Sequence, residues 1–363
     1  MKCLNRLGNK QPIIAKSYII SVCCCRIFAT FNLIAMYDNC TLWLDNFVVG
    51  EEVIKGLPLR LQNARQSVSI DTGETYSFGY IDGLRVNIYL SGISIKGSLS
   101  KFFYSNEDNR GNLLNLNRHT TRQAIEKLSE RLGVDADMAK VRSLEFGTYF
   151  VMINPVADYL NQMGVSPRLR RINVMEQTLY YKHRSKQSPK VLKIYDKRAE
   201  AVQKGYKLPS GFENANLLKY ELTLNGSIGK RLKWGEVTAS TLYNGEFYRR
   251  LMQMYIDCYF MIEKRPQLKS DIDMAKNIKS VGDACNALMA RLLNQSGIDL
   301  IDSFVSELKS QSVFVDRANY TRLKKKLNEI AAKSGFTMSN DLISELDDCI
   351  INIGADEGVY YER

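Results

Sequence analysis

The sequence predicts an α+β protein, with a mostly antiparallel β-sheet flanked by helices and an all-helical C-terminal domain after it. Two observations favour this fold. Short apolar segments with a period of two dominate the first 225 residues, and such alternation is typical of half-buried strands. Beyond residue 245, apolar residues recur at helical spacing instead. At 363 residues, the chain is long enough for one large domain or two ordinary ones.

Residues 1–36 differ from the rest of the chain, since they contain five Lys/Arg and no acidic residue. Lys16 and Arg26 interrupt their apolar run, so no stretch reaches the ~20 residues that span a bilayer. No small-residue cleavage pattern follows. We interpret residues 1–36 as a non-native or disordered extension ahead of a start at Met36. A weak membrane contact is the alternative, and no stable membrane association is expected.

Between Thr41 and Leu99, β-branched and aromatic residues alternate or cluster between Gly, Asp and Asn turns. This pattern predicts an antiparallel meander that opens with a strand over Thr41–Val49. A polar loop over residues 104–118 follows. Thr120 or Thr121 can then cap a helix that ends at Gly133.

Three later strands carry the residues of most interest. In the segment Val141–Met152, a period of two places Leu144 and Phe146 on one face and Glu145 on the other. The segment Leu217–Asn225 likewise turns Glu221 away from its leucines. Between them, residues 191–195 predict a short strand whose exposed face carries Lys193 and Tyr195.

If these strands share one sheet, Glu145, Tyr195 and Glu221 project from one surface. Two carboxylates there can hold Mg²⁺ or Mn²⁺, hard cations that take oxygen ligands. Tyr195 is the candidate nucleophile toward a phosphate, because a phenol needs cationic neighbours or a metal to be activated. Lys193 or Lys197 would offset the developing charge. The alternative nucleophiles are Tyr180, Tyr181 and Tyr220, and Tyr220 is disfavoured because its strand parity points it to the core.

Charge indicates a polyanionic partner. The formal net charge is +11, and residues 166–207 carry 12 Lys/Arg against three acidic residues, with tyrosines interleaved. Such a surface suits single-stranded nucleic acid, although a solvated basic surface is the alternative. The candidate DNA-binding residues are Arg168, Arg170, Arg171, Lys182, Arg184 and Lys193.

Other site chemistries are disfavoured. The eight cysteines include no Cys-x-x-Cys pair, which argues against a zinc ribbon and favours a reducing cytoplasm. Only His119 and His183 occur, which argues against histidine-cluster nucleases and most Ser-His-Asp schemes. Helical patterns cover 246–263, 272–294, 298–310 and 320–334, and a short acidic helix opens at Ser339. We place the domain boundary near residue 265, giving residues 37–265 and a helical domain with an acidic tail over residues 266–363.

Several segments, in the same order, resemble the filamentous-phage gene II/gene X replication initiators and related rolling-circle plasmid initiators. These segments are GISIKGSLSKF, RQAIEKLSERLGV, VRSLEFGTYFVM, LKIYDKRAEA, LLKYELTLN and VTASTLYNGEFY, between about residues 38 and 264. The Tyr-Asp-Lys-x-x-Glu motif is intact as Tyr195, Asp196, Lys197 and Glu200. One departure is Glu145, where the family strand usually carries Asp in an Arg-x-Asp-x-Ala pattern.

The resemblance implies a metal-dependent enzyme of the bacterial cytoplasm that nicks and rejoins one strand at a double-stranded origin. Its expected partners are supercoiled origin DNA, the displaced single strand, and the host helicase and polymerase. A non-catalytic origin-binding initiator or regulator is the main alternative. A conjugative relaxase is disfavoured by the missing histidine cluster. The oligomeric state, a homodimer included, stays open.

Overall fold

A large antiparallel sheet organises the computed structural model, which describes residues 36–104, 116–175, 177–183, 189–206, 208, 211–295, 300–356 and 358–359. The predicted α+β class is confirmed, including a helical C-terminal region. Ten described strands form one sheet in the order β2-β3-β4-β5-β1-β6-β10-β9-β8-β7. In chain order they span Met36–Asp45 (β1), Gln62–Val68 (β2), Thr75–Ile81 (β3), Leu84–Ile88 (β4), Gly92–Ser98 (β5), Lys140–Met152 (β6), Arg170–Val174 (β7), Thr178–Lys182 (β8), Lys190–Asp196 (β9) and Asn216–Asn225 (β10).

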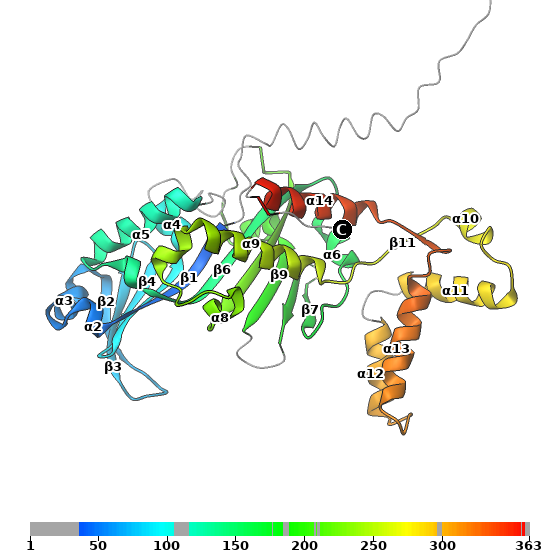
Figure 1. Ribbon diagram of the computed structural model, residues 1–363, viewed down its shortest axis with the longest axis horizontal. Helices are drawn as coiled ribbons and strands as arrows, with labels where there is room; N and C mark the ends of the chain where they lie inside the picture. Colours follow the sequence, from blue (N-terminus) through cyan, green and yellow to red (C-terminus); the bar gives the residue numbers. More distant parts are fainter. Residues whose placement is uncertain are drawn as a thin grey trace, which may run out of the picture.

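Helices cover one face of this sheet, with α5, α9 and α14 lying along it (Figure 1). The core forms on that face, because the alternate apolar residues of every central strand point there. The helices that belong to the sheet region are α2 (Asn46–Val49), α3 (Glu51–Gly56), η1 (Leu57–Arg60), α4 (Leu99–Phe103), α5 (Arg118–Leu132), η3 (Ala136–Met138), α6 (Val156–Gln162), α7 (Lys197–Gln203), α8 (Ile228–Leu232), η4 (Ala239–Tyr243), α9 (Gly245–Phe260) and α14 (Asp341–Asp356).

The predicted helix before Gly133 is present as α5, and Gly133 in the left-handed conformation ends it. The expected cap at Thr120 or Thr121 is wrong, because the Asn117 side chain accepts from the Thr120 backbone N–H and makes Asn117 the N-cap. The predicted strand over Thr41–Val49 is only partly right. β1 ends at Asp45, and the next four residues form the short helix α2. Phe47 and Val48 are exposed there, so apolar character misled the assignment.

The opposite face of the sheet carries a much smaller apolar cluster, made by Tyr149, Phe212 and Leu217. Tyr149 lies on β6 and Leu217 on β10, with the parity that points away from the main core. This second face therefore offers room for polar residues on the same strands. We call it the open face of the sheet.

A bulge in β1 affects which side chains reach the open face. Tyr37 pairs with Phe146 and Cys40 with Leu144, so Asp38 and Asn39 together oppose the single residue Glu145. An extra residue of this kind lets two core-facing residues sit three positions apart and re-aims the side chains between them. Both Tyr37 and Cys40 are buried in the main core.

The C-terminal region contains two kinds of helix. Helices α10 (Asp271–Ala275), α11 (Val281–Gln295), α12 (Leu300–Ser310) and α13 (Ala318–Ala331) extend away from the sheet (Figure 1). A separate cluster around Met274, Ala287, Ala290 and Phe336 holds part of this region together. The pattern predicted as one helix over residues 272–294 is two helices, α10 and α11. A minor two-stranded ladder pairs β11 (Gln267–Leu268) with β12 (Thr337–Met338).

Helix α14 returns to the main core instead. Ile343, Leu346, Ile350 and Ile353 are buried in the cluster formed by the sheet and α9. Asp347 accepts a hydrogen bond from Tyr259 at 2.7 Å, and Glu345 accepts one from Tyr159. The sheet region is thus completed by residues more than 75 positions beyond the predicted boundary near residue 265.

Several sequence predictions fall outside the described residues. These are the N-terminal extension, apart from Met36, most of the polar loop over residues 104–118, and the end of the acidic tail. Within the described part of the chain, no helix combines the length and apolar character that crossing a membrane would require.

The docking of α14 can be tested by truncating a side chain in its buried stripe. Ile350 is fully buried, so Ile350→Ala is expected to lower the free energy of unfolding of the sheet region by about 2–5 kcal/mol. The matched control is Ile272→Ala on α10, where the side chain is 74% exposed, with an expected change within about 0.5 kcal/mol. Urea denaturation measures both, and equal effects would contradict the assignment of α14 to the main core.

Candidate active site

Three carboxylates converge on the open face. Asp38 comes from β1, Glu145 from β6 and Glu221 from β10, and these strands are neighbours in the sheet. One oxygen atom of each carboxylate lies within 4.8 Å of the others. Glu145 and Glu221 were predicted to share a face, and the structure brings them together there. Asp38 is an additional member that strand parity did not reveal, because the bulge in β1 directs it to this face.

A buried lysine neutralises part of this acidic cluster. Lys219 Nζ lies 2.8 Å from Asp38 Oδ2 and 2.6 Å from Glu221 Oε1. Burial alone would lower the pKa of Lys219, but the charges of Asp38 and Glu221 hold it well above its usual value. Burial likewise acts to raise the pKa of Asp38, and the charge and hydrogen bond of Lys219 overcome this and hold it well below its usual range. The three groups form one charged network.

Gly147 permits this convergence. It pairs with Glu221 on β10 and with Met36 on β1, so it lies between the strands that supply the cluster. A Cβ at this position would come within 2.2 Å of the Tyr220 carbonyl oxygen and 2.9 Å of Glu221 Cα. Any side chain would therefore displace the backbone that carries Glu221. A glycine is required here by close approach of two strands.

Tyr195 contacts the same cluster. It pairs with Lys219 across β9 and β10, and its hydroxyl donates to Glu221 Oε1 at 3.1 Å. The expectation that Tyr195 lies on an exposed face is wrong, because only 3% of the residue is exposed. Burial raises the pKa of its phenol well above the usual value. In this state the phenol is a neutral hydrogen-bond donor.

Two lysines cover the Tyr195 ring. Lys193 Nζ lies 3.7 Å from the ring centroid and 3.6 Å from Glu221 Oε2, and 23% of its side chain is exposed. Lys197 Nζ lies 5.9 Å from the same centroid. Two ammonium groups therefore lie beside the ring of this buried tyrosine. An incoming phosphate would compete with the ring and with Glu221 for the Lys193 ammonium.

Lys197 is fixed by the start of α7. Asp196 caps this helix by accepting from the Ala199 backbone N–H at 2.9 Å, and Lys197 Nζ bonds Glu200 Oε2 at 2.7 Å. Burial lowers the pKa of Lys197, and the charge of Lys219 adds to this effect. Burial acts to raise the pKa of Glu200, but Lys197 and then Lys204 lower it to about 2. The residues of the Tyr-Asp-Lys-x-x-Glu motif are thus held as one unit by their own contacts.

The carboxylate cluster fits a divalent cation. Burial first, and then the negative charges of Glu221 and Asp38, raise the pKa of Glu145 to about 7. Asn39 donates to Glu145 Oε1 at 3.0 Å and orients it. Lys219 and Lys193 bring two positive charges to these three carboxyl groups. Oxygen donors with excess negative charge are the ligands that Mg²⁺ and Mn²⁺ prefer.

The predicted DNA-binding residues do not all lie on the open face. Lys193 pairs with Tyr180, and Arg170 pairs with Lys182, so these cations share the open face with Tyr195. Arg171 lies on the opposite face, where its Nε donates to the Met163 carbonyl at 3.1 Å. Arg168 is exposed in the turn before β7. Arg184 lies outside the described residues.

Of the alternative nucleophiles, two lie in the main core and one lies on the open face. The Tyr181 hydroxyl donates to the Gly164 carbonyl, and that of Tyr220 donates to the Tyr255 carbonyl, both in the main core. Tyr180 is partly exposed on the open face beside Lys193, 5.9 Å from ring centroid to Nζ. Among these four tyrosines, Tyr195 is the one whose hydroxyl bonds the carboxylate cluster.

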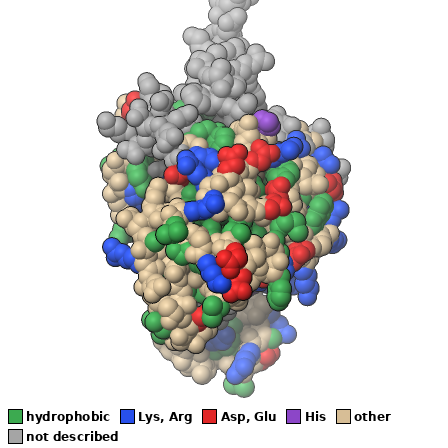
Figure 2. Space-filling model, turned by 90° about the vertical axis from the view of Figure 1, so that its left-hand side faces the viewer, with side chains coloured by type: hydrophobic (Ala, Val, Ile, Leu, Met, Phe, Trp, Pro, Cys, Tyr) green, Lys and Arg blue, Asp and Glu red, His purple; other side chains and the backbone are tan. Residues whose placement is uncertain are grey.

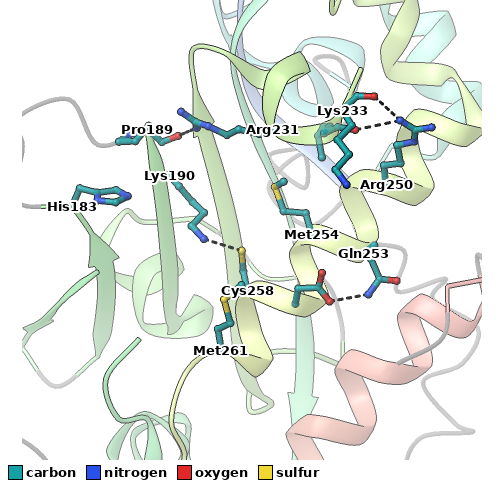
Figure 3. Close-up of a pocket in the computed structure, with 12 residues that line it drawn as sticks. His183, Pro189, Lys190, Arg231, Lys233, Arg250, Gln253, Met254, Cys258 and Met261 are labelled. Carbon is teal, nitrogen blue, oxygen red and sulfur yellow. Dashed lines mark hydrogen bonds between the residues drawn. The ribbon is translucent and has the colours of Figure 1, made fainter. Parts of the chain in front are cut away.

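A cavity of about 740 Å³ lies elsewhere, between the β8–β9 end of the sheet and helices α8 and α9 (Figure 3). Three of the cations that line it make structural contacts. Arg231 donates to the Pro189 carbonyl, Arg250 donates to the Lys233 carbonyl at 2.6 Å, and Lys190 bonds Cys258 at 3.3 Å. None of the three clustered carboxylates lines it. The candidate active site is therefore the cluster on the open face.

The shifted pKa of Glu145 predicts a pH-dependent stability in metal-free buffer. An acid with a raised folded-state pKa contributes stability below its unfolded pKa of about 4.3, and loses it as pH rises toward about 7. Glu145→Gln cannot ionise, so it is expected to match the wild type at pH 4.5 and to exceed it by about 1–3 kcal/mol at pH 8. Chemical denaturation in EDTA at both pH values measures this difference. A variant less stable than the wild type at pH 8 would contradict the crowded-carboxylate interpretation.

Removing the positive charge of Lys219 should lower the stability of the protein, whereas Glu145→Gln is expected to raise it at pH 8. Lys219→Met leaves Asp38 and Glu221 without their buried partner, and a loss of about 3–5 kcal/mol is expected. Because Mn²⁺ supplies positive charge to the same carboxylates, millimolar Mn²⁺ should raise the melting temperature of this variant more than that of the wild type. Lys182→Met, an exposed lysine on the same face, is the control. Equal Mn²⁺ effects on both variants would exclude a shared role for the lysine and the ion.

A comparison with protein-family models finds no match for this chain, and a comparison with curated proteins finds none either.

Proposed function

We propose that this protein is a metal-dependent nicking and closing enzyme that initiates rolling-circle DNA replication in the bacterial cytoplasm. The observation that carries the proposal is the Tyr195 hydroxyl, bonded to a cluster of three carboxylates with cations beside its ring. A tyrosine, an oxygen-ligand metal site and flanking lysines are together the groups that phosphodiester transfer needs. The proposal is also supported by the sequence segments that resemble those of gene II/gene X-type initiators and occur in the same order.

The reaction would proceed by transfer of a phosphoryl group to the tyrosine. Tyr195 Oη attacks phosphorus, and its proton moves to Glu221 Oε1, which already accepts its hydrogen bond. The bond from phosphorus to the 3′ oxygen breaks, and that oxygen takes up a proton. The products are a 5′-phosphotyrosyl link and a free 3′ hydroxyl that primes host polymerase. Attack by a 3′ hydroxyl on the link reverses the step and rejoins the strand.

The surrounding residues have separate roles in this scheme. Asp38, Glu145 and Glu221 would hold Mg²⁺ or Mn²⁺, which when bound supplies Lewis-acid polarisation of the phosphate. Lys193 and Lys197 offset the negative charge that develops on the phosphoryl oxygens. Arg170 and Lys182, exposed on the same face, contact the DNA backbone without reading its sequence.

The nucleophile is tested by two tyrosine variants. Tyr195→Phe is expected to lower nicking of a supercoiled plasmid, which carries the DNA flanking the gene, by at least about a thousandfold. The matched control is Tyr180→Phe, a partly exposed tyrosine on the same face, which should nick within about fivefold of the wild type. EDTA should abolish nicking by the wild type. Gel conversion to open circles measures the rate, and mass spectrometry locates the DNA adduct.

The outcomes separate the two candidate functions. An adduct on Tyr180, or normal nicking by Tyr195→Phe, would reject Tyr195 as the nucleophile. Salt-sensitive origin binding without cleavage by any variant, with either metal, would leave a non-catalytic initiator instead.

A further inference from the structure

The open face continues beyond the candidate active site across the other half of the sheet. Adjacent strands place paired residues on the same face. One row runs from Thr41 on β1 through Lys96 and Arg85 to Tyr80 on β3. Asn39, two residues before Thr41 on the same strand, bonds Glu145 of the carboxylate cluster. The row and the cluster therefore share one continuous surface.

A second row on this face is rich in aromatic side chains. It runs from Trp43 through Ser94 and Asn87 to Phe78 and Arg65. Tyr76 and Tyr89 stack beside it with ring centroids 4.9 Å apart, and Trp43 lies 6.0 Å from Tyr89. We call the five rings the aromatic platform; they are Trp43, Tyr76, Phe78, Tyr80 and Tyr89.

The platform is not part of the protein interior. Its rings are only partly buried, Tyr80 is 37% exposed, and none belongs to a hydrophobic cluster among the described residues. Five neighbouring aromatic side chains on a solvated sheet face exceed the scattered apolar exposure that ordinary surfaces show. Such a surface points to a ligand that covers it.

Cations accompany the rings. Arg85 lies 5.0 Å from the Phe78 centroid, and Arg142 lies 5.8 Å from the Trp43 ring. Arg65 and Lys96 are exposed in the same two rows. The acids nearby are engaged, since Asp45 bonds Trp43 Nε1 and Lys140, and Glu74 accepts from the Leu90 backbone N–H. The face therefore presents rings and positive charge together.

The end of the molecule that carries α2 and α3 shows a different distribution of charge. Basic and acidic side chains are interspersed in that view (Figure 2). Mixed charge of this kind gives no net attraction for a polyanion. On the platform rows, by contrast, the exposed charged residues Arg65, Arg85 and Lys96 are all cations.

We infer that the aromatic platform binds single-stranded DNA, with bases stacked on its rings and phosphates held by its arginines and Lys96. This combination is the one that single-strand binding surfaces use. The inference rests on the proposed function, because the platform joins the candidate active site. Trp43 lies five residues from Asp38 along β1, or roughly 17 Å of extended strand. The platform would hold the strand on one side of the scissile phosphate.

Intrinsic fluorescence offers a direct test. The chain has two tryptophans, Trp43 and Trp234, so Trp234→Phe leaves the platform residue as the only one. Titration of this variant with a dT oligomer is expected to quench the Trp43 emission as bases stack on the indole. The probe is an oligothymidylate of about 15 nucleotides in low salt, with EDTA present. Binding seen by anisotropy of a labelled oligomer without any quenching would overturn the inference.

Affinity measurements on full-length variants provide the second readout. Tyr80→Ala is expected to raise the Kd for the dT oligomer roughly tenfold, because one stacking contact is worth about 1–3 kcal/mol. Arg85→Ala should weaken binding several-fold and reduce its salt dependence. Arg249→Ala, an exposed arginine on the helix-covered side, is the matched control and should bind as the wild type does. Unchanged affinity in both platform variants would overturn the inference.

The same titrations separate this inference from the proposed chemistry. All are made in the Tyr195→Phe background, where no strand is cut. Loss of binding in the platform variants supports the platform even if the wild-type protein never nicks DNA. Retained binding in those variants would reject the platform as the DNA-binding surface. It would not bear on the proposed nicking reaction, which the Tyr195→Phe plasmid assay tests. Tighter binding of an oligouridylate of equal length would reject DNA as the ligand.

Discussion

The buried contact of Lys219 with Asp38 and Glu221 is the interaction on which the open face depends. Three strands supply four charged side chains to one place, where carboxylates alone would repel one another. An isolated buried charge is strongly unfavourable, so the ion pairs of Lys219 with Asp38 and Glu221 are what make the buried charges of Lys219 and Glu221 tolerable. Lys219 lowers the pKa of Asp38, whereas burial first, and then the charges of Glu221 and Asp38, raise the pKa of Glu145 to about 7.

The sheet gives this network its position. Glu221 and Lys219 are two residues apart on β10, so they share a face by strand geometry alone. Gly147 allows β6 to approach β10 closely, and the bulge in β1 adds Asp38 to the side that Glu145 occupies. The helix-covered core on the other face fixes the strands that carry these residues. The candidate active site and the main core thus lie on opposite faces of one sheet.

Strand parity predicted the α+β class and the common face of Glu145, Tyr195 and Glu221, because a period of two is a local property. Asp38 was missed since a bulge depends on pairing with β6, which local sequence does not reveal. The ion pairs of Lys219 with Asp38 and Glu221 were also missed, because they form only when β1 and β10 take their places beside β6. Tyr195 is buried because Lys193 and Lys197 lie beside its ring and its hydroxyl bonds Glu221 of β10. Long-range packing brings α14 back to the sheet. The aromatic platform was likewise hidden, since Trp43, Phe78 and Tyr89 become neighbours only when β1, β3 and β4 align.

A common surface links the candidate active site and the aromatic platform into one proposed path for DNA, with metal-assisted chemistry at the cluster as its centre. The most direct measurement is a crystal structure of Tyr195→Phe grown with Mn²⁺, using the anomalous scattering of manganese. The account predicts one strong anomalous peak, which marks a manganese ion within bonding distance of carboxylate oxygens of Asp38, Glu145 and Glu221. A map without manganese at these carboxylates at millimolar Mn²⁺, with Lys219 still bridging Asp38 and Glu221, would contradict it.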